Sequence, residues 1–372
     1  MTPLAGIRVV EAASFISGPL ASMTLADLGA DVIKVERPGG DPYRRFGRVH
    51  NGRGILFANC NRGKQSVVID LQSDEGQDEF RSLVGGADVL LTNWRPTMAR
   101  GLGFDEKSVR SQWPALVWVR VTGFGQDGPL ANAPAFDSII QARSGLASAL
   151  GGQDSPMLMP SWLCDKVAAV FAVQAVLAAV VQRQSTGSGS VVDLSMLDAV
   201  AYFNSVDLLA ERTRIGDGQG SPTENSQLRS NRPMRTKTGW LTLSPVGGRQ
   251  VMGMLTALGC PERGPELAAV QDQAEMVAML YELAEERLKS KTTEEWIERF
   301  AEHGVPAGPV LDMDEHLQDP QVLHNRTYVE YEDPELGLIR QARYPAEFDG
   351  DRLSTPAPAP GLDEGRGERP WR

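Results

Sequence analysis

The chain has 372 residues, of which 41% are hydrophobic and 23% charged, and its formal net charge is −11 at pH 7. This composition is typical of a soluble globular protein of two or three domains. The acidic balance argues against a general nucleic-acid-binding protein, because such a protein needs a basic face.

The sequence also argues against secreted, membrane and metal-binding proteins. No basic stretch precedes an apolar one at the start, and the longest apolar run, within 167–181, contains Gln174 and is predicted to be too short to span a bilayer. The three cysteines form no C-x-x-C pair and the four histidines are scattered, so we expect neither a disulfide framework nor a metal site. We therefore expect a cytoplasmic protein with no membrane or nucleic-acid partner.

Strands and helices alternate along the first half of the chain. Residues 7–13 read as a buried strand, 18–30 as a helix closed by Gly29, and 31–36 as a second strand, which together form a βαβ unit. Further strands are predicted at 65–71, 87–93, 115–122 and 190–196, with helices near 74–85 and after Asp165. This alternation predicts a doubly wound, Rossmann-like α/β domain with a parallel sheet.

The second half of the chain predicts a smaller domain. Residues 212–236 are polar and rich in Gly, Ser and Asn, which indicates a linker or loop. We expect a large α/β domain over 1–211, this linker at 212–236 and a small α+β domain over 237–325. Residues 326–372 are then a return segment that completes the large domain, ending in an extended Pro/Gly-rich tail.

Basic residues gather early in the chain. Eight of them fall within 31 positions: Lys34, Arg37, Arg44, Arg45, Arg48, Arg53, Arg62 and Lys64. We interpret half of them as a solvated basic surface. A local anion site stays open for the others, because the field inside a cleft depends on local charges and not on the net charge.

The stretch "GFGQDG" (123–128) matches G-x-G-x-x-G and follows a predicted strand. A dinucleotide site needs a helix to begin there, so that the helix N-terminus holds the pyrophosphate. Pro129 and Pro134 would break such a helix, and no acidic residue follows at the end of a strand about 20 positions later. We therefore reject a nicotinamide cofactor.

Asp165 stands at the head of the most apolar predicted helix, with Lys166 as its only charged neighbour until Arg183. Aspartate favours N-caps, where the orphan backbone N–H groups would bind the carboxylate and lower its pKa. A carboxylate that is ionised and oriented in a cleft is also a possible nucleophile. The residues alone leave both interpretations open.

Other nucleophile signatures are absent from the sequence. There is no G-x-x-x-x-G-K-[ST] loop, no G-x-S-x-G elbow and no histidine near a candidate Ser or Cys. We discount Cys164, because buried structural thiols are common and the neighbouring carboxylate would raise its pKa. Asp165 is the best remaining candidate.

Several stretches, in order and at family-like spacing, resemble the class III CoA-transferases, a family that includes formyl-CoA transferase and carnitine CoA-transferase. They are "SGPLASMTLADLGADVIKVERPGGD" (17–41), "NCNRGKQSVVIDL" (59–71), "TNWRP" (92–96), "VTGFGQDGP" (121–129), "FDSIIQARSG" (136–145), "GSVVDLSMLDA" (189–199) and "HGVPAGPVLDMDEHLQDPQV" (303–322). The resemblance covers nearly the whole chain.

The resemblance implies a transfer of CoA from an acyl-CoA donor to a carboxylic acid acceptor. An aspartate at the position of Asp165 would attack the acyl-CoA thioester and form a mixed anhydride, and exchange would proceed through an aspartyl-CoA thioester. Coenzyme A and acyl-CoA are then substrates, and no permanently bound cofactor is implied. Members of the family are interlocked homodimers, so the resemblance also implies a homodimer of this kind.

The resemblance further implies a site for coenzyme A. The matching positions are Phe15, Ile16, Arg37, Ile69, Asp70, Leu71, Gln72, Asn93, Trp94, Arg95, Arg100, Phe136 and Asp137. Backbone groups of the first two would approach CoA, Arg37 would contact the nucleotide, and 69–72 would meet phosphate and adenine. Residues 93–95 would follow the pantetheine arm, and 133–137 would lie near the thiol.

Two positions depart from the family pattern. The family often has lysine where this chain has Gln72, which removes one charge for phosphate. The usual arginine after "NWRP" is displaced, because Arg100 comes one position early and Gly101 takes its place.

The same family includes α-methylacyl-CoA racemases, which use a histidine and an aspartate as an acid–base pair. Where the histidine would fall, this chain has Phe136. One aspartate does not readily serve both faces of the α-carbon, so we favour the transferase. A non-catalytic CoA-binding protein is a third alternative, which Asp165 at the start of the helix argues against. The acceptor acid is not specified by the sequence, although Ile16 and Phe136 suggest an apolar acyl group.

Overall fold

The computed structural model describes residues 2–215, 232–353 and 357–365. The chain divides into two compact units, Met1–Leu209 with Arg326–Arg372 and Ala210–Asn325. Most of the predicted linker at 212–236 lies outside the described residues. Our finer domain boundaries stay a prediction.

A six-stranded parallel sheet forms the centre of the first unit, as the sequence predicts. Its strands are β1 (Arg8–Ala12), β2 (Asp31–Glu36), β5 (Lys64–Val68), β6 (Val89–Thr92), β7 (Val117–Thr122) and β8 (Val191–Ser195). They lie in the order β5-β2-β1-β6-β7-β8, which is the 3-2-1-4-5-6 order of a doubly wound fold. The chain therefore changes direction across the sheet between β1 and β6.

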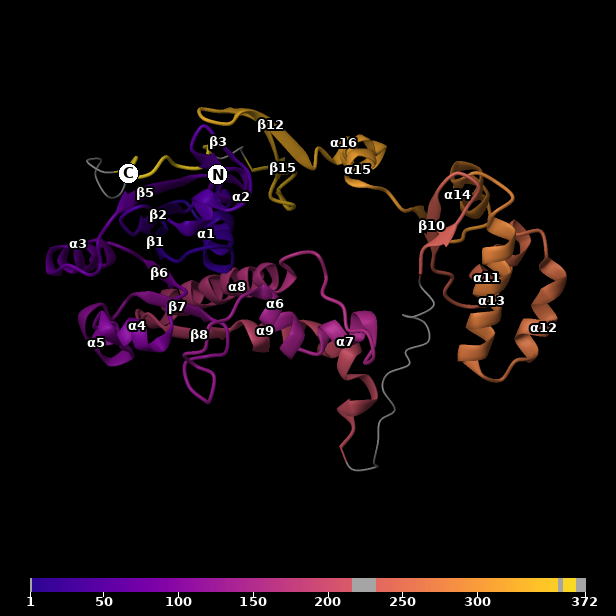
Figure 1. The fold of residues 1–372 in the computed structure, drawn as a ribbon, viewed down its shortest axis with the longest axis horizontal. Coiled ribbons are helices and arrows are strands. Elements are labelled where there is room, and N and C mark those ends of the chain that lie inside the picture. Colours follow the sequence, from indigo (N-terminus) through magenta and orange to yellow (C-terminus); the bar gives the residue numbers. More distant parts are fainter. Residues whose placement is uncertain (1, 216–231, 354–356, 366–372) are drawn as a thin grey trace. The chain divides into compact units, whose positions relative to one another are not determined.

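Helices cover both faces of this sheet (Figure 1). Helices α1 (Ser17–Asp27), α8 (Leu163–Thr186) and α9 (Met196–Asn204) share a core with Val9 and Val89. Helices α3 (Asp74–Gly85), α4 (Pro96–Gly101) and α5 (Glu106–Gln112) pack on the other face with Val10 and Leu90. Successive strand residues point to opposite faces, which is why the strands contribute buried apolar side chains to both cores.

Helix α8 is longer than the apolar run that the sequence suggested. It continues through Gln174 to Thr186 and has 24 residues, so by length and composition it could cross a membrane, and our estimate from the run alone was wrong. One face of the helix, including Ala168, Ala172 and Val176, is buried in the core shared with α1 and β7. This packing is that of a core helix in a globular fold.

A fully buried charge cluster lies between the central strands and α1. Glu11 of β1 stands opposite Lys34 of β2, and its carboxylate accepts from Lys34 Nζ and from Lys64 Nζ, both at 2.7 Å. Burial alone would raise the pKa of Glu11, but the two ammonium groups outweigh it and lower the pKa to about 2. Glu11 is therefore a permanent anion.

The early basic residues are mostly not on the surface. Five of the eight are buried and ion-paired: Lys34, Arg44, Arg53, Arg62 and Lys64. Our interpretation of half of the cluster as a solvated surface holds for three residues, Arg37, Arg45 and Arg48, which are exposed. Some of the carboxylates that bind the other five are distant in sequence, as Asp333 is from Arg53 and Asp27 from Arg62, and cannot be recognised from composition.

The end of the chain returns to the first unit. The hairpin of β12 (Tyr328–Asp333) and β13 (Gly337–Ala342) places Asp333 2.8 Å from the guanidinium of Arg53. Residues 357–365 run along the outer edge of β5, where Val68 N donates to Asp363 (2.8 Å) and Gly365 N to the carbonyl of Ser66 (2.8 Å). This described part of the predicted tail is packed rather than free. The rest of the tail lies outside the described residues.

Shorter elements complete the first unit. They are 3-10 helix η1 (Pro42–Arg45), β3 (Val49–His50), β4 (Arg53–Gly54), α2 (Ile55–Asn61), α6 (Asp137–Arg143), α7 (Leu146–Gly151), η2 (Ser205–Leu209), β14 (Glu347–Phe348) and β15 (Asp351–Arg352). The sequence predicts no helix directly after "GFGQDG", and the next helix, α6, begins only at Asp137.

The second unit is a small antiparallel sheet with helices. Its elements are η3 (Ala210–Thr213), β9 (Met234–Arg235), β10 (Trp240–Leu243), α11 (Gly248–Ala257), η4 (Pro261–Arg263), α12 (Gly264–Ala269), α13 (Gln273–Leu288), α14 (Thr293–Glu302), β11 (Ala307–Pro309), α15 (Met313–Gln318) and α16 (Pro320–Asn325). The strands lie in the order β11-β10-β9, and Trp296, Phe300 and Leu280 are among the side chains of its own core.

Replacing Glu11 by glutamine should destabilise the first unit strongly. The change leaves two buried ammonium groups facing a neutral amide, so we expect a loss of about 3–5 kcal/mol in the free energy of unfolding. Glu330→Gln is the matched control, because the Glu330–Arg340 pair is largely exposed and contributes about 0–1 kcal/mol. Urea denaturation compares the two variants, and equal losses would contradict the role given to Glu11.

Candidate active site

A cavity of about 1240 Å³ opens at the carboxyl edge of the parallel sheet. Its lining includes residues that follow β1, β6 and β7, namely Phe15, Asn93 and Gly123. This is the point where the strand order reverses, and in doubly wound folds the crevice at such a point is the usual ligand site. The topology alone therefore places the cavity where a ligand is expected.

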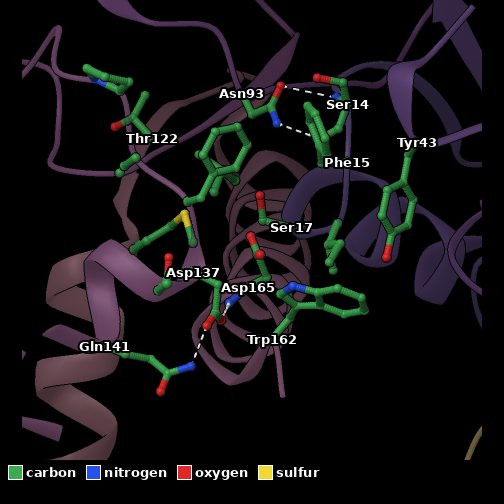
Figure 2. A pocket seen from close by; sticks show the side chains of 18 of the residues that line it. Ser14, Phe15, Ser17, Tyr43, Asn93, Thr122, Asp137, Gln141, Trp162 and Asp165 are labelled. Carbon is green, nitrogen blue, oxygen red and sulfur yellow. Dashed lines mark hydrogen bonds between the residues drawn. The ribbon is translucent and has the colours of Figure 1, made fainter. Parts of the chain in front are cut away.

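A side-chain clamp fixes the two loops that meet at this point. Asn93, which follows β6, donates from Nδ2 to the carbonyl of Ser14 at 2.8 Å and accepts from Ser14 N at 3.2 Å (Figure 2). The next residue, Phe15, has φ 66°, a left-handed conformation that side chains other than glycine adopt at a cost of about 1–3 kcal/mol. Strain of this kind persists only where the surroundings hold it in place.

The buried charge cluster supports the same loop. Phe15 N donates to Asp41 Oδ1 (3.4 Å), and Tyr43 N donates to the same atom (2.9 Å). The other oxygen of Asp41 lies 2.9 Å from Lys34 Nζ. A continuous path of ion pairs and hydrogen bonds thus connects Glu11 and Lys34 to the wall of the cavity.

Asp165 lies in the first turn of α8 and lines the cavity (Figure 2). Its side chain is not the helix cap. Asp137, the first residue of α6, provides the cap instead, because its Oδ1 accepts from Cys164 N (2.6 Å) and from Asp165 N (3.1 Å). The cap interpretation of Asp165 was wrong because a residue 28 positions earlier in the chain takes the two N–H groups.

This arrangement reverses the expected pKa of Asp165. Burial, and next the negative charge of Asp137, raise its pKa from 3.8 to about 7. Our expectation of a lowered pKa was wrong, since the first-turn N–H groups donate to Asp137 and no hydrogen bond within the described residues reaches the Asp165 carboxylate. Asp165 is therefore a partly desolvated carboxyl group that titrates near neutral pH.

Gln141 of α6 holds Asp137 and the opposite wall together. Its Nε2 donates to Asp137 Oδ2 (2.5 Å) and to the carbonyl of Ser161 (3.1 Å), and its Oε1 accepts from Met159 N (2.8 Å). Since these three bonds use both ends of one amide, the segment before α8 is fixed to α6. Asp137 and Asp165 are thereby kept close together.

The structure brings part of the expected site together. Seven of the expected residues line the cavity: Phe15, Ile16, Asn93, Arg95, Phe136, Asp137 and Asp165. Among these, Asp137 is buried and bound to the start of α8, so its carboxylate organises Asp165.

The other expected residues lie outside the cavity lining. Arg37 follows β2 and 69–72 follow β5, so both are on the carboxyl edge of the sheet, on the β5 side of β1. Arg37 is exposed, and its Nε donates to the carbonyl of Gly40. The side chains of Ile69 and Trp94 belong to the core, and Arg100 is exposed in the last turn of α4. Their assignment to CoA stays a prediction.

Sequence reasoning missed several residues of the site. Tyr43, Phe46 and Trp162 line the cavity beside Asp165, and Gln141 positions its neighbour. They come from a 3-10 turn, from a loop and from a short helix that the alternating pattern does not predict. The only signal that the sequence offers is for Trp162, which is close to Asp165 in the chain, and for Gln141, which is close to Asp137.

The cysteines and the possible metal ligands offer no competing centre. Cys164 is buried, and burial together with the charges of Asp137 and Asp165 raises its pKa to about 12, which confirms our decision to discount it. In the described parts of the chain, no group of three or more His, Cys, Asp or Glu side chains could hold a metal ion.

Comparison with known proteins gives consistent matches over the whole length. Residues 4–366 match the family model of CoA-transferase family III. The succinate–glutarate CoA-transferase of Agrobacterium fabrum is 31% identical over 97% of this chain and 93% of its own length, and a probable fatty acyl-CoA transferase of Mycobacterium tuberculosis is 30% identical over 82% of both chains. The crystal structure of a CAIB/BAIF family protein from Brucella suis superposes with a TM-score of 0.82 at 28% identity, covering 98% of this chain and 97% of that one.

Replacing Asp165 by asparagine should stabilise the fold, and more so at alkaline pH. The folded protein retains a proton on Asp165 up to about pH 7, whereas the unfolded chain releases it near pH 4, so ionisation of Asp165 lowers stability as the pH rises between these values. We expect Asp165→Asn to gain about 2–4 kcal/mol at pH 8 and about 1–2 kcal/mol at pH 5. Denaturant unfolding at both pH values measures the gain, and a loss of stability at pH 8 would contradict it.

Proposed function

The chain belongs to CoA-transferase family III and is a CoA-transferase, and from this premise we propose that Asp165 is its nucleophile. The observation that supports this most directly is the carboxyl group of Asp165, which lines the cavity at the switch point without a hydrogen bond from the described residues. A nucleophile has to keep its lone pairs free for the substrate. Asp137, in contrast, uses its oxygens to hold the start of α8.

The first half of the proposed reaction moves CoA from the donor onto Asp165. A carboxylate oxygen of Asp165 attacks the thioester carbonyl carbon, the C–S bond breaks, and CoA leaves as the thiolate. The product is a mixed anhydride between Asp165 and the donor acid. The thiolate then attacks the Asp165 carbonyl carbon of this anhydride, which releases the donor acid as a carboxylate and leaves an aspartyl-CoA thioester.

The second half repeats these steps with the acceptor. The acceptor carboxylate attacks the aspartyl-CoA thioester, releases CoA thiolate and forms a second mixed anhydride. The thiolate attacks the acyl carbon of the acceptor, so the acceptor leaves as its CoA thioester and Asp165 is restored as a carboxylate. Atoms and charges balance over the four steps, and no external acid or base is required.

The environment of Asp165 suits this chemistry. A carboxyl group with a pKa near 7 is about half ionised at neutral pH, and its ionised form is more basic, and thus more nucleophilic, than an ordinary aspartate. Partial desolvation removes the water shell that would otherwise weaken the attack. The aromatic side chains around it limit access of water, which would hydrolyse an anhydride.

Coenzyme A is proposed to lie along the carboxyl edge of the sheet. The exposed guanidinium of Arg37 pairs with no carboxylate among the described residues and is available for the nucleotide. The 69–72 loop would meet phosphate and adenine, and 93–95 would follow the pantetheine arm towards 133–137. The role of Arg100 stays a prediction, since the residue lies outside the cavity lining.

The racemase alternative is not favoured. Phe136, where a second proton carrier would stand, is an exposed aromatic ring that packs edge-on against Phe15 at 5.3 Å. The described lining of the cavity contains no histidine that could act as a second proton carrier beside Asp165. A non-catalytic CoA-binding role would leave the raised pKa of Asp165 without a purpose.

We also propose a cytoplasmic, interlocked homodimer, with two copies of this chain as partners. The family resemblance supports it, as do exposed apolar side chains on α9 and the turn after it, including Tyr202, Phe203 and Val206.

Trapping with hydroxylamine tests the nucleophile. Mixing the protein with acyl-CoA and then hydroxylamine should leave a hydroxamate on Asp165, which is visible as a mass shift of the intact protein and in its peptide map. Asp165→Ala should show no adduct and at least about a 10³-fold loss of CoA transfer, because no other group replaces a covalent nucleophile. An adduct elsewhere, or α-deuteron exchange without an adduct, would contradict the proposal.

The pH dependence tests the environment of Asp165. Since only the ionised form attacks, kcat/KM should rise with pH and level off above an apparent pKa of about 7. Asp137→Asn removes the neighbouring negative charge and keeps an oxygen that can accept from Cys164 N. We expect this variant to move the rising limb down by about one pH unit. An unmoved limb would show that Asp137 does not set the pKa.

A further inference from the structure

The wall of the cavity beside Asp165 is a connected group of aromatic rings. Phe15 contacts Phe136 (5.3 Å between ring centroids) and Tyr43 (6.0 Å), and Trp162 contacts Tyr43 (6.4 Å) and Phe46 (6.2 Å). We call these five residues the aromatic wall. All of them line the cavity, so the rings face the space where a substrate would lie.

Three rings of the aromatic wall are incompletely covered. Phe46, Trp162 and Phe136 are 47%, 38% and 57% exposed, whereas Tyr43 is buried beneath them. Exposed aromatic surface concentrated in a cavity is typical of a site for an apolar ligand group. The scattered single apolar residues of an ordinary surface do not form such a connected group.

The aromatic wall lies next to the reacting carboxylate. Trp162 is the N-cap residue of α8, three positions before Asp165, and Phe136 directly precedes the Asp137 that holds this helix start. Burial raises the pKa of Tyr43, and the charges of Cys60 and Asp165 add to the effect, which places Tyr43 within electrostatic reach of Asp165. A group attached to the carbonyl that Asp165 attacks would therefore contact these rings.

The charges around the cavity are unfavourable for a second carboxylate. Among the described residues of the lining, Arg95 is the only cation, and its Nη1 points to the carbonyl of Asn132 (3.4 Å). Lys166, beside Asp165 in the chain, donates to Ser161 Oγ (2.7 Å) and is not part of the lining. The acids Asp137 and Asp165 would repel a further anion. A buried carboxylate without a cation is unfavourable, so a dicarboxylic acyl group would bind poorly here.

We infer that the aromatic wall binds the acyl group of an apolar monocarboxylic acid and that the cavity selects against dicarboxylic acyl groups. This inference rests on the proposed function, because it takes Asp165 as the point of attack. Each methylene that moves from water to this wall should strengthen binding about fourfold until the wall is covered. Specificity then comes from apolar contact with the aromatic wall and from the scarcity of cations, since Arg95 is the single cation of the lining among the described residues.

Self-exchange tests the inference without knowledge of the natural acceptor. The protein is incubated with an acyl-CoA and the isotopically labelled acid of the same acyl group, and transfer of the label into acyl-CoA is followed by mass spectrometry. The matched pairs are butyryl with succinyl and hexanoyl with adipoyl, with acetyl as the short reference. We expect kcat/KM at least about tenfold higher for the monocarboxylic member of each pair, consistent with the cost of an unpaired carboxylate.

Variants separate the aromatic wall from the chemistry. Trp162→Ala should lower hexanoyl exchange about tenfold or more and acetyl exchange less than about threefold, since acetyl is too short to cover the wall. Phe348→Ala, an exposed aromatic residue of β14 outside the cavity lining, is the matched control and should change neither. Phe136→Arg adds a cation at an exposed position and should raise the succinyl-to-butyryl ratio about tenfold, even if Trp162→Ala fails to fold.

The outcomes distinguish this inference from the function on which it rests. Equal or faster exchange of succinyl and adipoyl by the unmodified protein would overturn the inference and leave the transferase intact. Equal losses for acetyl and hexanoyl in Trp162→Ala, with an unchanged ratio in Phe136→Arg, would overturn it as well. No exchange with any acid, or undiminished exchange by Asp165→Ala, would overturn the proposed function and the inference together.

Discussion

The pairing of Glu11 with Lys34 and Lys64 is the interaction on which the site depends. Three charges without access to water are tolerable only because each has partners at hydrogen-bonding distance. Lys34 extends the pairing to Asp41, and Asp41 holds the backbone of Phe15 and Tyr43. The left-handed backbone of Phe15 is therefore held by the ion-paired Asp41 and by the hydrogen bonds between Asn93 and the preceding residue, Ser14. Asp165 is the exception to this rule of pairing, and the contrast supports the proposal that it is the reactive group.

Asp137 and Asp165 differ in their roles because they occupy different positions at the start of α8. Asp137 satisfies the N–H groups at the start of α8 and accepts from Gln141, so its negative charge is stabilised. Asp165, within the first turn of the same helix, gains nothing from those N–H groups and is repelled by Asp137. A helix N-terminus usually favours a nearby carboxylate, and here that benefit goes to the aspartate that holds the structure rather than to the one proposed to react.

The sequence predicted the sheet well and the site only in part. Apolar runs and Gly29 locate β1, α1 and β2 because local spacing reports helix and strand directly. Elimination of other nucleophiles led to Asp165, and the family resemblance gave its role and added Phe15 and Asn93. Three features escaped prediction: the capping of α8 by Asp137, the buried partners of the basic residues, and the part of the aromatic wall that comes from 42–46 and 162. Each depends on contacts between segments distant in sequence or in short turns, where no periodic pattern exists. For the buried ion pairs, the available signal was a charged residue at matching positions of two neighbouring strands, Glu11 of β1 and Lys34 of β2.

The segment at 357–365 carries a consequence for biosynthesis. It occupies the outer edge of β5 with bonds to Val68 and Ser66, and β5 is the last strand on that side of the sheet. An open strand edge invites pairing with other chains. During synthesis the ribosome delivers β5 nearly 300 residues before the segment that covers it. The outer edge of β5 therefore stays unpaired for much of synthesis. A chain that ends before residue 357 would leave this strand edge exposed permanently, as a template for aggregation.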